Sequence, residues 1–277
     1  MDDLAVLITV YNDDAGLKTA LDSIDEAENG FTVVVVDGAS EVPTVIDENR
    51  YPFKTVVIRQ EERSGIIGGL NEGLEYIRAE GFKYMARLDA GDLHRSNRLA
   101  IQYERLRDSE TLAMVGSNAL YRSETTGDGL YLSDVPLTTP EIRKWSICRT
   151  CFIHPTVMIR LDRIDPSLHY ESRYLHIEDY ILFTKIAERY ETENVAEPLV
   201  DCFVREGGIS RKNDKAQLLS GVRHHLEHPK VFNVLWYAYV FKRLLYLIVP
   251  FRRRVQLKSW LGLVRPPQVP ASSTNRS

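Results

Sequence analysis

Thr-Val-Val-Val-Val-Asp-Gly-Ala-Ser, residues 32–40, indicates the fold more clearly than any other segment. Its four consecutive valines are too few for a helix and are typical of a β-strand buried on both faces. The Asp-Gly pair that follows them favours a turn. Similar short apolar runs occupy residues 4–10, 55–58 and 84–88. We therefore expect a set of buried strands.

Segments with helical spacing of apolar residues lie between these runs, at residues 16–24, 66–79 and 97–106. Strands that alternate with helices are typical of a mostly parallel sheet with helices on its faces. The fold class is therefore α/β.

Composition limits the class of protein. The chain has 277 residues with 44% hydrophobic and 27% charged, which excludes a disordered chain or a coiled coil. Three cysteines are too few for a disulfide framework and suit a reducing compartment. The N-terminus lacks the basic segment of a signal peptide, so we expect a cytoplasmic protein.

Charge divides the chain into an acidic body and a basic C-terminal segment. Residues 230–277 contain nine basic residues and no acidic one, so this segment has a charge of +9. Because the whole chain has a net charge of −4, residues 1–229 have a net charge of −4 − 9 = −13. A nucleic-acid-binding protein would have a basic folded face. We therefore expect no nucleic acid partner.

Polar residues follow each expected strand, where open parallel sheets bind ligands. They are Thr9, Tyr11, Asn12 and Asp13, then Asp37 and Ser40, then Arg59, Glu62 and Arg63, and finally Asp89 and Asp92. No G-x-G-x-x-G or G-x-x-x-x-G-K-[ST] follows the first run, which argues against dinucleotide and P-loop enzymes. We expect neither NAD nor haem. Carboxylates at strand ends favour a divalent cation that bridges them to phosphate oxygens.

Six sequence blocks in order resemble family 2 glycosyltransferases, over residues 4–212. The blocks are Leu7–Asn12, Val34–Ser40, Leu70–Gly73, Arg87–Asp92, Phe152–Met158 and Ile177–Tyr180. The resemblance implies a GT-A fold, a Rossmann-like mixed and mostly parallel sheet flanked by helices. It also implies inverting transfer of a sugar from a nucleoside-diphosphate sugar, such as a UDP- or dTDP-sugar, to an acceptor hydroxyl. Bacterial lipopolysaccharide and other cell-surface polysaccharide transferases are the members it resembles.

The resemblance also assigns residues to the donor site. Thr9, Tyr11, Asn12, Asp37, Arg63, Asp89 and Arg205 would bind the nucleotide sugar, with Asp37 on the base and Arg205 near the diphosphate. An arginine beside phosphate is physically sensible because its planar group forms paired hydrogen bonds. The alternative for Asp37 is an Asx turn after a strand.

Asp89 and Asp92 match the acidic motif that would hold Mg²⁺ or Mn²⁺. Gly91 stands where many relatives carry another Asp, so either Asp92 substitutes or the metal binds weakly. The alternative role, a cap on the following helix, explains only one of the two carboxylates.

Catalytic residues are expected at Glu178-Asp179. By the resemblance Asp179 is the base that takes the acceptor proton, with Glu178 beside it. Both could instead simply stabilise a helix N-terminus. His154 would face the acceptor, or be a structural histidine.

The expected domains are a catalytic domain at residues 1–215, a helical arm at 216–264 and a disordered tail at 265–277. Within the first, residues 1–116 would bind the nucleotide sugar, and 117–215 would bind the acceptor and carry the base. The arm is aromatic and basic, and includes a short helix at 258–264. Lys242 and Arg243 would be costly in a spanning helix, so we expect interfacial helices on anionic lipid. The alternative is packing on the body or in a homo-oligomer interface.

Together these features predict a glycosyltransferase of cell-surface glycan assembly on the cytoplasmic face of the inner membrane, acting on a glycan or lipid-linked acceptor. The alternatives are an inactive membrane-bound scaffold, which Gly91 favours, and a sugar nucleotidyltransferase, which lacks support because no glycine-rich phosphate loop follows the first run.

Overall fold

A computed structural model describes residues 1–24, 30–47, 49–95, 97–204 and 213–249, with Arg253 and the pair Val264–Arg265. The strands are β1 Leu4–Val10, β2 Thr32–Asp37, β3 Lys54–Arg59, β4 Tyr84–Arg87, β5 Leu93–His94, β6 Leu112–Ser123, β7 Gly129–Ser133, β8 Met158–Arg160, β9 Glu191–Val204 and β10 Val264–Arg265. The helices are α1 Asp14–Asp22, α2 Gly65–Ala79, α3 Arg98–Asp108, α4 Thr139–Trp145, α5 Glu178–Arg189, α7 Asp214–Glu227 and α8 Val234–Ile248. Short 3-10 helices occupy His154–Thr156 and Leu161–Arg163.

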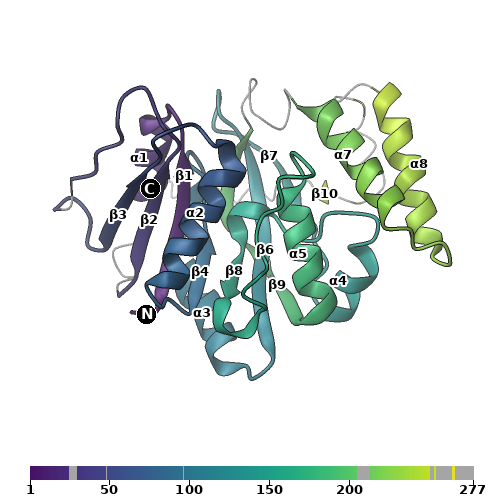
Figure 1. Ribbon diagram of the computed structural model, residues 1–277, viewed down its shortest axis with the longest axis horizontal. Helices are drawn as coiled ribbons and strands as arrows, with labels where there is room; N and C mark the ends of the chain where they lie inside the picture. The colour runs from purple at the N-terminus through teal and green to yellow at the C-terminus, as the bar shows by residue number, and fades with distance from the viewer. Residues whose placement is uncertain are drawn as a thin grey trace, which may run out of the picture.

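One mixed sheet organises the chain, in the order β10-β7-β6-β8-β4-β1-β2-β3. Strands β3, β2, β1 and β4 are parallel, and β9 pairs parallel with β6. Strand β8 is antiparallel to both β4 and β6, so those two strands run in the same direction. The carboxyl ends of β1, β2, β4, β6 and β9 therefore meet at one edge. The predicted fold class is confirmed (Figure 1).

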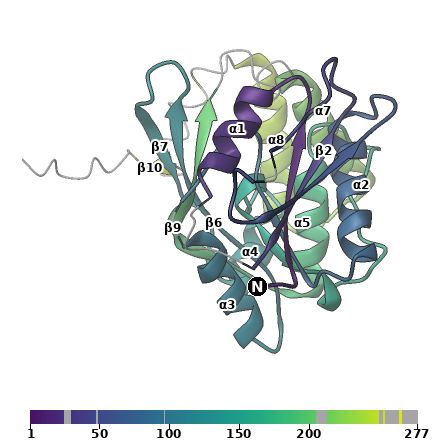
Figure 2. The same ribbon diagram turned by 90° about the vertical axis from the view of Figure 1, so that its left-hand side faces the viewer.

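The core lies on both faces of the sheet because the buried side chains of each strand alternate. In β1, Val6 and Ile8 join the cluster that contains α1 and α3. Ala5 and Leu7 join the cluster that contains α2, α4 and α5. Figure 2 shows α1 and α3 on one side of the sheet and α2 and α5 on the other. This burial explains why the valine-rich strands have no polar face.

Gly73 lets α2 approach β1 closely. A Cβ atom at this position would lie 2.3 Å from Cδ1 of Leu7, much closer than real side chains pack. The glycine in the Leu70–Gly73 block therefore allows α2 to pack closely on the sheet.

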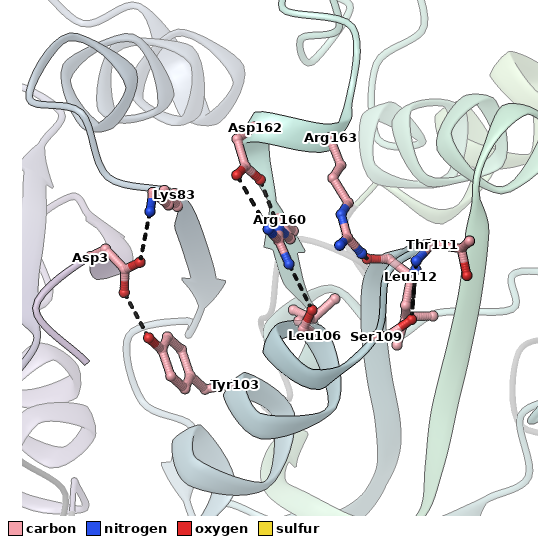
Figure 3. A network of polar contacts seen from close by, with 10 residues as sticks. All are labelled: Asp3, Lys83, Tyr103, Leu106, Ser109, Thr111, Leu112, Arg160, Asp162 and Arg163. Carbon is pink, nitrogen blue, oxygen red and sulfur yellow. Dashed lines mark hydrogen bonds and ion pairs between the residues drawn. The ribbon is translucent and has the colours of Figure 1, made fainter.

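A polar network covers the amino-end edge of the sheet, opposite the strand ends that carry the candidate site (Figure 3). Tyr103 Oη donates to Asp3 at 2.9 Å, and Lys83 pairs with the same carboxylate at 3.9 Å. Arg160 donates to Asp162 at 2.8 Å and to the Leu106 carbonyl at 3.0 Å. These contacts join α3 to the starts of β1 and β4 and to the end of β8.

Helices α7 and α8 form a hairpin at the end of the molecule beyond α5 (Figure 1). Trp236 Nε1 donates to the His225 carbonyl at 3.0 Å, and the Tyr239 ring stacks on His225 at 3.7 Å. Within the described part of the chain, no helix combines the length and apolar character that crossing a bilayer requires.

Two details of the C-terminal segment differ from expectation. Lys242 Nζ donates to the Cys148 carbonyl at 2.6 Å, and Arg243 donates to the Gln217 carbonyl at 3.3 Å. Both side chains point into the protein, where they satisfy carbonyl groups, and not toward lipid. Val264 and Arg265 pair with β7 as β10, where a helix end and a tail were expected. The rest of the predicted 258–264 helix lies outside the described residues.

Candidate active site

Asp37, which is predicted to contact the base, is the last residue of β2, and its side chain is fully buried. Its Oδ1 accepts from the Ser40 amide at 2.9 Å, and its Oδ2 accepts from the Thr44 amide at 3.1 Å and from Arg59 at 2.5 Å. Burial alone would raise the pKa of Asp37, but hydrogen bonds from Ser40, Thr44 and Arg59 outweigh it and lower the pKa. An ionised Asp37 thus shapes the loop that follows β2; its contact with a base stays a prediction.

Tyr11 and Arg63 form an exposed flat surface beside that loop. The Arg63 guanidinium lies 3.9 Å from the centre of the Tyr11 ring, and Tyr11 is 39% exposed. Asn12 holds the two loops together, because its amide donates to Ser40 Oγ at 2.8 Å and its Oδ1 accepts from the Glu41 amide at 2.8 Å. A flat cationic and aromatic surface suits stacking of a planar base.

Arg87 is a fully buried arginine behind Asp89. It donates to Asp89 Oδ1 at 2.6 Å, to His154 Nε2 at 3.3 Å and to the Leu7 carbonyl. Burial, and then the neighbouring guanidinium, lowers the pKa of His154 to about 4, so the imidazole is neutral. Tyr170 Oη also lies 3.2 Å from His154 Nε2. His154 thus contacts Arg87 on the donor side; its predicted acceptor role stays a prediction.

The residues of the acidic motif differ in what they can offer a cation. Asp89 has 37% of its side chain exposed, and its Oδ2 has no partner among the described residues. Gly91 adopts φ +92°, a left-handed conformation that favours glycine. Asp92 Oδ1 accepts from the Phe203 amide at 3.0 Å and joins this loop to β9.

Metal binding by protein groups alone is not favoured, because the described residues include no group of three His, Cys, Asp or Glu side chains placed to hold an ion. Mg²⁺ commonly takes only one or two carboxylates together with substrate phosphates. The open oxygen of Asp89 fits such a site.

Glu178 and Asp179 begin α5 at the same edge of the sheet. Glu178 is 7% exposed, and its Oε2 is buried without a hydrogen-bond partner among the described residues. Burial, and after it the Glu178 carboxylate, raises the pKa of Asp179 to about 7, and Asp89 contributes to the same rise. The site therefore brings an acid of the donor side close to a carboxyl group that can accept a proton near neutral pH.

A family model described as glycosyl transferase family 2 matches residues 5–165, more than half of the chain. The chain belongs to this family. This chain is 23% identical to an uncharacterised glycosyltransferase of Methanocaldococcus jannaschii over 259 residues, which cover 89% of this chain and 88% of that protein. A UDP-Gal:alpha-D-GlcNAc-diphosphoundecaprenol beta-1,3-galactosyltransferase of Escherichia coli is 28% identical over 204 residues, 71% of this chain and 72% of the relative.

Solved structures share the transferase's fold. S. aureus TarS 1–349 in complex with UDP-GlcNAc has a TM-score of 0.61 at 18% identity, covering 94% of this chain and 79% of that one. The mannosyltransferase PcManGT from Pyrobaculum calidifontis, in complex with GDP-Man and Mn²⁺, has a TM-score of 0.58 at 16% identity, covering 94% and 80%. These likenesses support the GT-A architecture.

Two residues at the candidate site, Arg87 and Tyr170, were not predicted as site residues from the sequence. One predicted site residue, Arg205, lies outside the described residues. Arg87 is an arginine inside a buried strand, and an isolated charge in such a run signals a buried partner. Tyr170 contacts His154, which in turn contacts Arg87. No sequence motif around Tyr170 indicates this contact, because it depends on tertiary packing. Arg205 lies outside the described residues, so its predicted contact with the diphosphate stays a prediction.

Proposed function

We propose that the chain transfers a sugar from a nucleoside-diphosphate sugar to an acceptor hydroxyl with inversion, with Asp179 as general base. The observation that carries this proposal is the carboxyl pair Glu178-Asp179 in the first turn of α5, with Glu178 buried. Burial, the Glu178 carboxylate and the charge of Asp89 raise the pKa of Asp179 to about 7. Family membership supports sugar transfer.

The chemistry is a direct displacement at the anomeric carbon. As the acceptor oxygen bonds to C1, the bond from C1 to the diphosphate oxygen breaks, and Asp179 takes the acceptor's proton. Burial, and after it the Glu178 carboxylate, keeps the pKa of Asp179 high enough for this transfer. Arg87 holds Asp89 in place. Asp89, with Asp92 as the second candidate ligand, would hold a divalent cation, whose charge would stabilise the leaving diphosphate.

The donor is proposed to be a UDP- or dTDP-sugar, seated on Tyr11, Arg63 and the loop that Asp37 shapes. TarS and PcManGT, which bind UDP-GlcNAc and GDP-Man, support a nucleotide-sugar donor. The test is to follow released nucleoside diphosphate and the anomer of the product. Retention of the donor's anomeric configuration, or no release with any donor, would contradict the proposal.

The acceptor is proposed to be a glycan or lipid-linked sugar of lipopolysaccharide or another cell-surface glycan. The Escherichia coli relative, whose name specifies a diphosphoundecaprenol acceptor, supports this. The enzyme would then work on the cytoplasmic face of the inner membrane.

The outer face of α8 supports contact with that membrane. It is apolar along its length, with Val234, Tyr237, Phe241, Leu244, Leu245 and Ile248 exposed, while Phe232 in the preceding turn is fully exposed. These side chains recur at helical spacing on one face. Interfacial helices bury such a face at the boundary of head groups and acyl chains.

Acidic substitutions on the outer face of α8 are expected to weaken vesicle binding strongly. In flotation with anionic vesicles, the chain should rise with the lipid, and Phe241→Glu with Ile248→Glu should lower the bound fraction more than tenfold, because each exposed apolar side chain contributes about 1.5–3 kcal/mol when buried. Val45→Glu is the matched control, because Val45 is 87% exposed on the β2–β3 connection. Equal flotation of all three chains, or a stable dimer that only the α8 substitutions dissociate, would contradict membrane contact.

A further inference from the structure

The residues around the proposed base pack outside the two large clusters of the sheet. A separate buried cluster is formed by Tyr174, Ile177, Tyr180 and Ile181. Side chains from later turns of α5 belong instead to the cluster that contains α2. The first turn of α5, which carries Asp179, therefore depends for its packing on something other than the sheet.

The α7–α8 hairpin supplies this packing (Figure 1). The Tyr180 ring lies nearly parallel to two rings of the hairpin, with its centre 6.2 Å from that of His225 and 6.4 Å from that of Tyr239. The Tyr174 ring meets His224 edge-on, with ring centres 5.0 Å apart. Rings of α7 and α8 thus cover the residue directly after the proposed base and the segment that precedes it.

A single side chain of α7 holds the backbone where α5 begins. Gln217 Nε2 donates to the carbonyl of His176 at 2.9 Å. His176 adopts φ +68°, a left-handed conformation that is costly for a residue with a side chain. Residues keep such a conformation only where the surrounding structure fixes them. The Gln217 amide provides this restraint just before the helix that carries Asp179.

The hairpin also fixes a loop that supports Tyr180. Tyr180 Oη donates to the Ser146 carbonyl at 2.6 Å. The next carbonyl of this loop, that of Ile147, lies 2.9 Å from His225 Nε2 of α7. The carbonyl after that accepts from Lys242 of α8. The hairpin and the first turn of α5 are therefore bound to the same short loop.

We propose that the α7–α8 hairpin is part of the catalytic apparatus, with Gln217 as the positioning residue that fixes the place of Asp179. This inference rests on the proposed role of Asp179 as base. A general base must lie within hydrogen-bond distance of the proton it takes, so a small shift of the first turn of α5 moves the carboxylate out of reach. Gln217 acts through the His176 carbonyl and not on the substrate. The outer face of α8 is the one proposed to contact the membrane, so one element would serve both tasks.

The test compares Gln217→Met, Gln217→Lys and Arg223→Met with wild type. Methionine keeps the length of glutamine but cannot donate a hydrogen bond, whereas lysine keeps a donor at this position. Arg223→Met is the matched control on α7, because Arg223 is exposed and donates within the helix to Glu227 at 2.9 Å.

Each chain is assayed without vesicles, so that membrane contact does not enter the result. The donors are UDP-glucose, UDP-galactose, UDP-GlcNAc and dTDP-glucose, the acceptor is a short-chain lipid diphosphate sugar, and released nucleoside diphosphate gives kcat. Calorimetric titration with UDP and dTDP counts the folded donor sites in each chain and gives their affinity.

Gln217→Met is expected to lower kcat by about 10–100-fold, because a misplacement of about 1 Å can cost a factor of about a hundred. The number of nucleotide sites per chain and their affinity should stay within about twofold of wild type, since the donor side of the site is untouched. Gln217→Lys should recover most of kcat, and Arg223→Met should change neither quantity.

Two results would overturn the role of the hairpin while leaving the proposed function standing. One is an unchanged kcat in Gln217→Met, and the other is a loss of kcat matched by an equal loss of nucleotide sites, which would come from unfolding. A wild type that releases no nucleoside diphosphate with any of these donors would overturn both proposals.

Discussion

Asp179→Asn is expected to lower kcat by a factor of about 10²–10⁴, the usual contribution of a positioned general base. Asparagine keeps the size of the side chain and its place in the first turn of α5, but it cannot take a proton. Donor affinity should stay close to that of wild type, since the substitution removes only the base. Rates of nucleoside diphosphate release with saturating donor and acceptor give the measurement.

The pH profile gives the same prediction a second readout. A base with a pKa of about 7 is protonated below that pH, so kcat/KM of the wild type should rise with pH up to about 7 and then level off. Glu178→Gln is the matched control: it keeps the base and, because the Glu178 carboxylate raises the pKa of Asp179, should move the rise to lower pH. An Asp179→Asn chain with kcat within threefold of wild type would contradict the assignment and favour a scaffold.

Asp179→Asn, which is expected to lower kcat, is expected to raise folding stability at alkaline pH. A carboxyl group whose pKa is raised in the folded state destabilises that state as pH rises from its ordinary value of 3.8 to about 7. Asp179→Asn removes this cost, so the variant should melt at a higher temperature than wild type at pH 8 and at nearly the same temperature at pH 4. The carboxylate of the proposed base is thus held at some expense of stability.

Arg87→Met is expected to destabilise the fold by about 1–3 kcal/mol, because it leaves buried hydrogen-bond acceptors without a donor. Arg87 is fully buried and contacts Asp89, His154 and the Leu7 carbonyl, and methionine can replace none of these hydrogen bonds. Urea unfolding measures the change. The loss should also weaken nucleotide-sugar binding, because Asp89 would no longer be held.

Arg50→Met is the matched control for this loss. Arg50 pairs with Asp22 at 3.1 Å, but about half of its side chain is exposed, and exposed pairs contribute about 0–1 kcal/mol. Combining Arg87→Met with Asp89→Asn should cost less than the sum of the two single changes, because the second substitution removes the charge left unpaired by the first. Equal destabilisation by Arg87→Met and Arg50→Met would show that the buried network carries no special stability.

The first half of the fold could be predicted because its signals are local. The valines of β2 and the apolar runs of β1 and β4 are buried on both faces, and helical patterns separate them. Strands β6 and β9 gave no such signal. They contain Gly116, Asn118 and Pro198, which lower strand propensity, and their pairing joins residues far apart in sequence.

Some residues of the candidate site could be predicted from the sequence, whereas their interactions could not. Asp89 and Asp179 stand in short blocks that sequence alone could identify, but their mutual influence is a tertiary effect. The direction of Lys242 could not be predicted either. A lysine on an aromatic helix suits lipid head groups as well as a buried carbonyl, and here the Cys148 carbonyl binds it.

Proton NMR of the transfer reaction, started with an α-linked UDP- or dTDP-sugar and a short-chain lipid diphosphate sugar as acceptor, reports the anomeric configuration of the product. Direct displacement with Asp179 as base predicts a β-linked product, one nucleoside diphosphate released for each sugar transferred, and product formation slowed by a factor of about 10²–10⁴ in Asp179→Asn. An α-linked product, or the same product and rate from Asp179→Asn, would contradict the account.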